Sequence, residues 1–120
     1  MLSEGCILNG VRVRKSIIGL RSRIDKGVNV EDSILMGSDF FESIEEISKN
    51  IKRGIPHIGI DENTIIRKAI IDKNVRIGKN VKLINREGAE NYDSSDRSFY
   101  IREGIIIIPK NALIPDGTEI

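Results

Sequence analysis

Lysine side chains recur at the centres of short polar triplets that end in Gly or Asn, a pattern that could bind anions. Four triplets are centred on lysine: Asp25-Lys26-Gly27, Asp72-Lys73-Asn74, Gly78-Lys79-Asn80 and Pro109-Lys110-Asn111. Gly and Asn tolerate the positive φ of a sharp turn, so each triplet predicts a corner of the chain with its lysine outside. Such an ammonium group can contact a phosphate, each contact contributing about 1.5–3 kcal/mol. Corner lysines also serve solubility, so the spacing alone assigns them no function.

The elements that position these corners follow from the spacing of the aliphatic residues. They recur at steps of six with one step of five. The first series is Ile7, Val13, Ile18, Ile24, Val30 and Met36; the second is Ile60, Ile66, Ile71, Ile77 and Leu83; the third is Ile108, Ile114 and Ile120. Residues 5–30 match residues 58–83 at many positions, so one block occurs twice, offset by 53 residues. Short strands with one inward aliphatic per six residues, separated by corners, are the signature of a hexapeptide β-helix.

The sequence therefore predicts an all-β fold, a single-stranded left-handed parallel β-helix that spans residues 1–120 as one domain. Three hexads, about 18 residues, would form one triangular coil, and neighbouring coils would pair as parallel strands. The left hand follows known hexapeptide proteins. An aromatic content of 4% and the abundance of isoleucine indicate a narrow aliphatic core, in which we expect Cys6 to be a small residue.

Two segments interrupt the period and predict loop insertions. Residues 38–57 have apolar positions at near-helical spacing and end at Gly54-Ile55-Pro56, which predicts a loop with one or two helical turns. Residues 85–98 are polar, which predicts a solvated excursion from a corner.

Charge and composition exclude several classes of partner. The formal net charge of +1 predicts no binding to nucleic acid, and no apolar run reaches the roughly 20 residues of a membrane helix. One cysteine excludes an intrachain disulfide and fits a reducing compartment. We therefore expect a cytoplasmic protein with no membrane partner.

Several strings beyond the period resemble one family. They are Ser16–Ile24 (SIIGLRSRI), Leu35–Asp39 (LMGSD), Ala69–Gly78 (AIIDKNVRIG), Phe99–Ile105 (FYIREGI) and Ile108–Ile120 (IPKNALIPDGTEI). Together, and in order along the chain, they resemble the C-terminal domain of ADP-glucose pyrophosphorylase, also called glucose-1-phosphate adenylyltransferase. This family makes ADP-glucose and pyrophosphate from ATP and glucose 1-phosphate in glycogen and starch synthesis.

The resemblance implies a regulatory and oligomerisation domain rather than a complete enzyme. In the family an N-terminal nucleotidyltransferase domain carries out the chemistry with Mg²⁺ and ATP, and its Gly-rich loop is absent from these 120 residues. We therefore expect no catalytic residue, no metal ligand and no cofactor in this chain, and no turnover by it alone. Because Met1 begins almost inside the repeat, the sequence has the character of a fragment. The implied partners are a catalytic domain of the same family and further subunits of a homo- or hetero-oligomer.

The resemblance also implies an effector site at Lys73 and Lys110. These residues fall in motifs where plant and cyanobacterial members place lysines that bind 3-phosphoglycerate, with phosphate as the competing inhibitor. Arg76 and Arg102 are candidate helpers. Pro109 replaces the bulky aliphatic residue of many such sequences, so fructose 1,6-bisphosphate, the effector of other branches, remains an alternative. A plant or algal source would imply a plastid location.

Two rival functions stay open. Other hexapeptide β-helices are acyltransferases, which usually need a catalytic His, or zinc anhydrases, which use three His ligands. His57 is the only histidine in the chain, and we interpret it as a loop residue. A free-standing scaffold without regulation is the other alternative.

Overall fold

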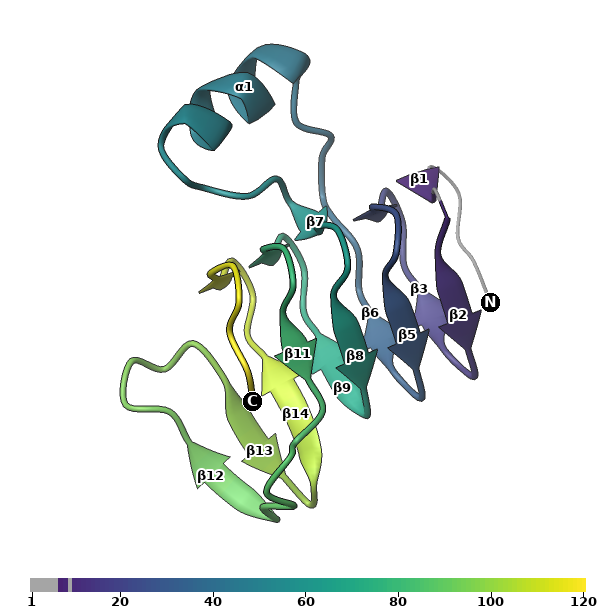
Figure 1. The fold of residues 1–120 in the computed structure, drawn as a ribbon, viewed down its shortest axis with the longest axis vertical. Helices are drawn as coiled ribbons and strands as arrows, with labels where there is room; N and C mark the ends of the chain where they lie inside the picture. The colour runs from purple at the N-terminus through teal and green to yellow at the C-terminus, as the bar shows by residue number, and fades with distance from the viewer. Residues whose placement is uncertain (1–6, 9) are drawn as a thin grey trace.

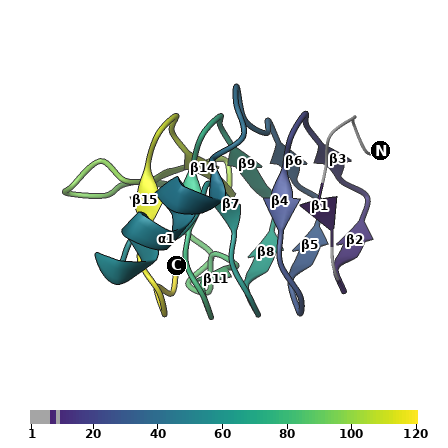
Figure 2. The same cartoon turned by 90° about the horizontal axis from the view of Figure 1, so that it is seen from above.

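The chain winds into a three-sided parallel β-helix, seen in a computed structural model that describes residues 7, 8 and 10–120 (Figure 1). Its principal extents are 40 × 31 × 23 Å. Figure 2 shows neighbouring coils side by side from the N-terminal end to the C-terminal end, with helix α1 lying across one face. Within the described residues, no helix is long and apolar enough to cross a membrane.

Each side of the prism is one sheet. Face 1 is formed, in spatial order, by β1 (Ile7–Leu8), β4 (Arg23–Ile24), β7 (Gly59–Ile60), β10 (Arg76–Ile77) and β15 (Leu113–Ile114). Face 2 is formed by β2 (Arg12–Arg14), β5 (Asn29–Glu31), β8 (Ile65–Arg67) and β11 (Lys82–Leu83). Face 3 is formed by β3 (Ile17–Ile18), β6 (Ile34–Leu35), β9 (Ala69–Ile71), β14 (Ile105–Ile108), β13 (Tyr100–Arg102) and β12 (Asn91–Asp93). The pairings within faces 1 and 2, and those from β3 to β14, are parallel.

The core is a stack of β-branched and other aliphatic side chains along the axis of the prism. Ile24 pairs with Ile60, Ile60 with Ile77, and Ile77 with Ile114 on successive coils of face 1, and all four are buried. Of the other predicted core residues, the following are buried: Ile18, Val30, Ile66, Ile71, Leu83 and Ile108. Val13 and Ile120 are partly buried against this cluster. The side chains of Cys6 and Ile7, also predicted to be inside, lie outside the described residues.

Met36 is a wrong core prediction. Its side chain is 42% exposed, and Leu35, at 4%, fills the core position instead. The physical reason is that the corner between faces 2 and 3 is one residue short in each of the first three coils. Val13 to Ile18, Val30 to Leu35 and Ile66 to Ile71 are all steps of five. Ile18 pairs with Leu35, so an uninterrupted coil contains 17 residues rather than 18.

The predicted corners turn through backbone of positive φ. All four lysine-centred triplets place their last residue in this region: Gly27, Asn74, Asn80 and Asn111, with φ between 55° and 78°. Asn63 and Gly117, at the same corners of other coils, have φ of 60° and 75°. The short corner between faces 2 and 3 uses Lys15, Asp32 and Lys68 with φ of 49–50°. Longer side chains therefore also occupy the left-handed region when the stacked coils hold them there.

The first insertion leaves face 3 after β6 and returns at β7. It contains α1 (Ile44–Lys52), and Ser43 caps the N-terminus of this helix. The Ser43 hydroxyl accepts a hydrogen bond from the amide of Glu46, and the Glu46 carboxylate accepts one from the amide of Ser43. No residue of α1 is buried. The position of the helix therefore depends on the legs of the loop, where the nearly buried Glu42 carboxylate lies 2.9 Å from Arg76 Nη1.

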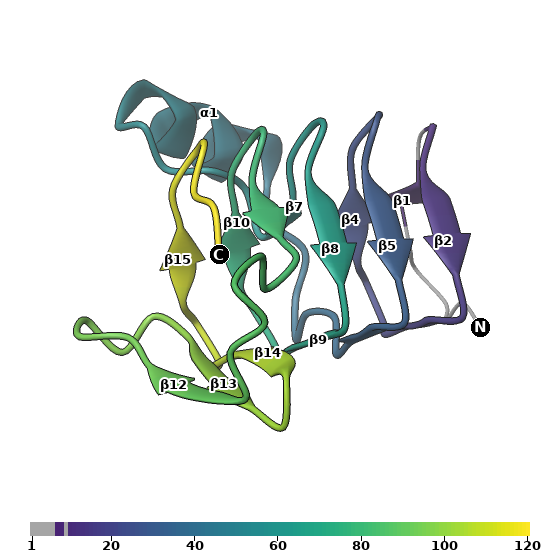
Figure 3. The same ribbon diagram turned by 60° about the horizontal axis from the view of Figure 1, so that its bottom comes forward.

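The second insertion adds strands that the polar composition of residues 85–98 does not indicate. Tyr92 pairs with Ile101, and Ile101 pairs with Ile106, both antiparallel, so β12 and β13 extend face 3 beyond the last parallel strand (Figure 3). All three residues of β12 are exposed, so this strand lacks the alternation of buried and exposed side chains by which strands are recognised.

Candidate functional site

Lys73 and Lys110 lie on neighbouring coils of one corner, although 37 residues separate them in the sequence. This corner joins face 3 to face 1, and we call residues 20–22, 37–39, 72–74 and 109–111 the lysine edge. Backbone hydrogen bonds link its levels: the Ser38 amide donates to Leu20, the Asn74 amide to Gly37 and the Asn111 amide to Lys73, at 2.9–3.1 Å. The 85–98 excursion projects elsewhere and leaves these two levels in contact.

Asp39 joins the two lysines. Its Oδ1 lies 3.2 Å from Lys73 Nζ, and its Oδ2 lies 3.7 Å from Lys110 Nζ. Asn74 holds the same residue, donating to Oδ2 at 3.1 Å and accepting from the Asp39 amide at 3.0 Å. The hydrogen bond from Asn74, followed by that from Lys73, lowers the pKa of the Asp39 carboxyl below its ordinary value. The Asp39 carboxylate thus lies in contact with both ammonium groups.

Arg21 adds a third cation to the lysine edge. Its Nε donates to the carbonyl oxygen of Ser38 at 3.1 Å, next to Asp39 in the chain. Sequence reasoning did not select Arg21 or Asp39. The 17-residue length of a coil could have identified Arg21. When the first insertion is left out of the count, this length places residues 20–21 at the same corner as residues 73–74.

The structure does not bring Arg76 to the two lysines. Arg76 Nη1 donates to Glu42 Oε2 and to the carbonyl oxygen of Pro56, both at 2.9 Å. Both partners belong to the first insertion, so Arg76 anchors that loop to face 1.

Arg102 lies on the outer side of β13. Its Nη2 is 2.6 Å from Asp93 Oδ1, and its guanidinium carbon lies 5.3 Å from the centre of the Tyr100 ring. Arg102, Tyr100 and Pro109 line an open depression of about 450 Å³. Pro109 precedes Lys110, so this depression adjoins the lysine edge while the arginine itself is paired elsewhere.

The other corner lysines have different surroundings. At the corner between faces 1 and 2, successive coils place Lys26, Glu62, Lys79 and Asp116 in a column that alternates in charge, stacked through the amides of Asn63, Asn80 and Gly117. Lys26 and Lys79 therefore have an acidic residue on the neighbouring level. Only at the lysine edge, among the described corners with lysine-centred triplets, do two lysines follow each other directly. This difference separates the candidate anion site from ordinary corner lysines.

A comparison with protein families agrees with the architecture. The model of the GLGC left-handed parallel β-helix domain matches residues 1–119. The predicted all-β class, the left hand and the resemblance are thereby confirmed. The chain belongs to the GLGC family of left-handed parallel β-helix domains and corresponds to the C-terminal domain of ADP-glucose pyrophosphorylase.

Proposed function

We propose that this glucose-1-phosphate adenylyltransferase-like domain binds a phosphate-ester effector at Lys73 and Lys110 and transmits its presence to a catalytic domain of the same family. The observation that carries this proposal is the shared contact of both ammonium groups with the Asp39 carboxylate, at 3.2 and 3.7 Å. Two cations that converge on one exposed carboxylate can converge equally on a phosphate. Charge-assisted contacts of this kind are the stronger class of hydrogen bond.

Asp39 acts in this proposal as an internal competitor. An arriving ester displaces its carboxylate, and the displaced side chain moves into water because the residue is exposed. Both 3-phosphoglycerate and fructose 1,6-bisphosphate carry two anionic groups, enough to contact the two lysines together. Inorganic phosphate offers a single group, which fits a weaker, inhibitory ligand at the same edge.

Replacing Asp39 by Asn should tighten effector binding. Because exposed ion pairs contribute about 0.2–1 kcal/mol, loss of the competing charge should lower the half-saturating effector concentration by about 1.4–5-fold. The measurement is activation of the enzyme in which this domain is joined to its catalytic domain, titrated with each ester separately. Asp32→Asn, an equal charge change at an exposed corner of another edge, is the control and should leave the curve unchanged. Equal responses of the two variants would contradict the proposal.

Face 3 carries a second part of the proposed function, the assembly of subunits. A row of large side chains points outward across it, because Ile17 pairs with Ile34, Ile34 with Ile70, Ile70 with Ile107, and Ile107 with Tyr100. Ile17 and Ile34 are 46% and 40% exposed. The corresponding positions of face 2 include charged residues: Arg12, Arg14, Glu31, Arg67 and Lys82. Exposed apolar patches mark interaction surfaces.

We assign this row to contact with a second copy of the domain, since a straight row of this kind is self-complementary about a two-fold axis. Ile34→Glu should shift the assembled protein to a smaller oligomer, measured by light scattering on a size-exclusion column. Ile44→Glu, on the 83% exposed first residue of α1, is the control and should keep the assembly. If Ile34→Glu leaves the oligomer intact but uncouples effector binding from activity, the row faces the catalytic domain instead.

A further inference from the structure

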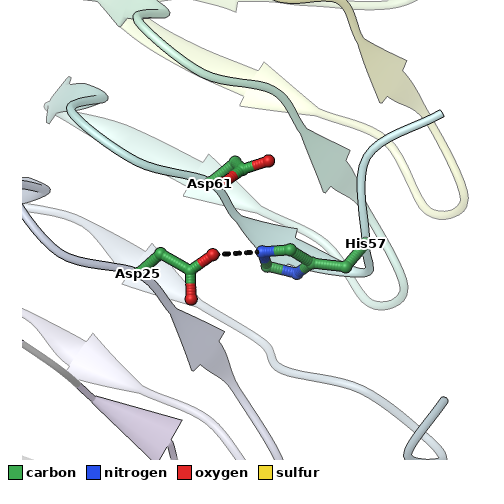
Figure 4. Close-up of side chains that lie close together, drawn as sticks. All are labelled: Asp25, His57 and Asp61. Carbon is green, nitrogen blue, oxygen red and sulfur yellow. Dashed lines mark hydrogen bonds and ion pairs between the residues drawn. The ribbon is translucent and has the colours of Figure 1, made fainter. Parts of the chain in front are cut away.

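His57 is a buried histidine at the returning leg of the first insertion, beside two aspartates of the coil. Its side chain is 6% exposed. Asp25 follows β4 and Asp61 follows β7, and the pairing of Ile24 with Ile60 places these aspartates at equivalent positions on neighbouring coils. Figure 4 shows the imidazole directed at Asp25, with Asp61 on the coil above. The family resemblance predicts no metal ligand in this chain.

The hydrogen bonds of His57 determine where its lone pair points. Nδ1 lies 2.7 Å from the carbonyl oxygen of Ile58, which can only accept, so Nδ1 carries a proton. Nε2 lies 2.9 Å from Asp25 Oδ2. In a neutral imidazole this nitrogen has only a lone pair, which would face the lone pairs of a carboxylate. A proton carried by either group, or a metal ion, is needed between them.

A backbone carbonyl that accepts from one ring nitrogen is also the usual support of a metal-binding histidine. It fixes the tautomer and turns the other nitrogen toward the ion. His57 therefore has the supporting contact of a ligand already in place.

The two aspartates concentrate negative charge at the same point. One carboxylate oxygen from each aspartate lies within 4.8 Å of the other and of a ring nitrogen of His57, so the two carboxylates repel each other when both are charged. Arg23 Nε donates to Asp25 Oδ1 at 3.5 Å and compensates part of this charge. A cation between the carboxylates would relieve this repulsion.

We propose that Asp25, His57 and Asp61 form a binding site for a divalent transition-metal ion, with Zn²⁺ as the best match. One imidazole nitrogen and two carboxylate oxygens are a ligand set that zinc accepts, whereas Ca²⁺ and Mg²⁺ prefer oxygen alone. One ligand atom from each residue lies within 4.8 Å of the other two. A tetrahedral zinc site needs separations of about 3.4 Å, between the 2.9 Å from His57 Nε2 to Asp25 Oδ2 and the 4.8 Å that bounds the whole set.

The fourth coordination position would open toward solvent. The three residues line a cavity of about 290 Å³ between the first insertion and face 1, together with Ile47 and Ile51 of α1. The ion would join the returning leg of the insertion to two coils. Because no residue of α1 is buried, such a clip would fix the position of the helix on the prism.

The test is zinc titration of the domain in a Cys6→Ser background, because Cys6 is the only cysteine and could bind the metal by itself. We expect one Zn²⁺ per chain by calorimetry. At 100-fold excess over the dissociation constant the melting temperature should rise by about 10 °C. Co²⁺ should replace zinc and give a visible absorption band. Asp61→Asn, which keeps the shape of the side chain, and His57→Gln should each lower zinc affinity by about 100-fold or more.

Glu62→Gln is the matched control, since Glu62 lines the same cavity and is not a proposed ligand. It should keep both the stoichiometry and the affinity. The proposal is overturned if the Cys6→Ser protein binds no zinc, or if Asp61→Asn binds it as tightly as the parent. Circular dichroism of the metal-free variants distinguishes loss of zinc binding from loss of folding. If His57→Gln does not fold, the zinc affinity of Asp61→Asn alone decides whether the proposal holds.

Discussion

Ile77→Asp should abolish cooperative unfolding of the domain. The Ile77 side chain is fully buried between Ile60 and Ile114 on the neighbouring coils of face 1. Removing such a side chain costs about 2–5 kcal/mol, and burying an unpaired charge adds several more. The sum reaches the roughly 5–15 kcal/mol that stabilises a typical domain, so circular dichroism should show no native melt. Ile77→Val should lower the free energy of unfolding by only about 0.5–1.5 kcal/mol.

Adjacent residues in β6 and just beyond it provide the control. Leu35→Asp should unfold the protein as Ile77→Asp does, whereas Met36→Asp should retain the melt, because Leu35 is 4% and Met36 42% exposed. A native melt for Ile77→Asp or Leu35→Asp would contradict the assigned register. If Met36→Asp unfolded the protein and Leu35→Asp did not, Met36 would be the core residue, as the strict six-residue spacing predicts.

The hexapeptide period predicts most of the fold because each inward position lies at a nearly constant distance along the chain. The corners that end in Asn or Gly are equally predictable, since these residues are suited to positive φ, whereas the corner that uses Lys15, Asp32 and Lys68 is not. The Met36 error shows what the period lacks. A step of five residues at one corner makes Leu35 rather than Met36 point inward. Because both residues are apolar, the sequence does not show which of them lies in the core.

The β12–β13 hairpin could not be predicted from its residues. Its strands pair on an existing sheet edge, and of the six residues of β12 and β13 only Ile101 is buried in the core. Tyr92 and Phe99 stack their rings with centres 5.8 Å apart. Two aromatic residues seven positions apart in a polar segment are a weak signal for strands.

The candidate sites depend on contacts between coils, which the sequence specifies only indirectly. The resemblance identified Lys73 and Lys110, but their proximity depends on the number of coils between them, and that number is hidden by the second insertion. Asp39 and His57 lie in or beside the first insertion, where the period gives no position. Both contact the coils because the first insertion leaves the prism after β6 and returns to it at β7, on the next coil.

Charge reversal at the lysine edge should remove effector activation. Each lysine would contribute about 1.5–3 kcal/mol to binding a phosphate ester, so Lys73→Glu or Lys110→Glu alone should raise the half-saturating concentration by about 10–100-fold. The double variant should show no activation. The two effects should not add, because both side chains share Asp39. The measurement is the effector titration of the enzyme that combines this domain with its catalytic domain.

The control is Lys26→Glu, which changes the same charge at the corner where lysines and acidic residues alternate. Its activation curve should match that of the parent, and basal activity without effector should be equal in every variant, since none of these lysines is placed in the chemistry. Separate titrations with 3-phosphoglycerate and fructose 1,6-bisphosphate would show which ester loses more from each substitution. If the double variant were still activated, the lysine edge would not be part of the effector site. The fold and the proposed metal site would be unaffected by that result, because neither depends on Lys73 or Lys110.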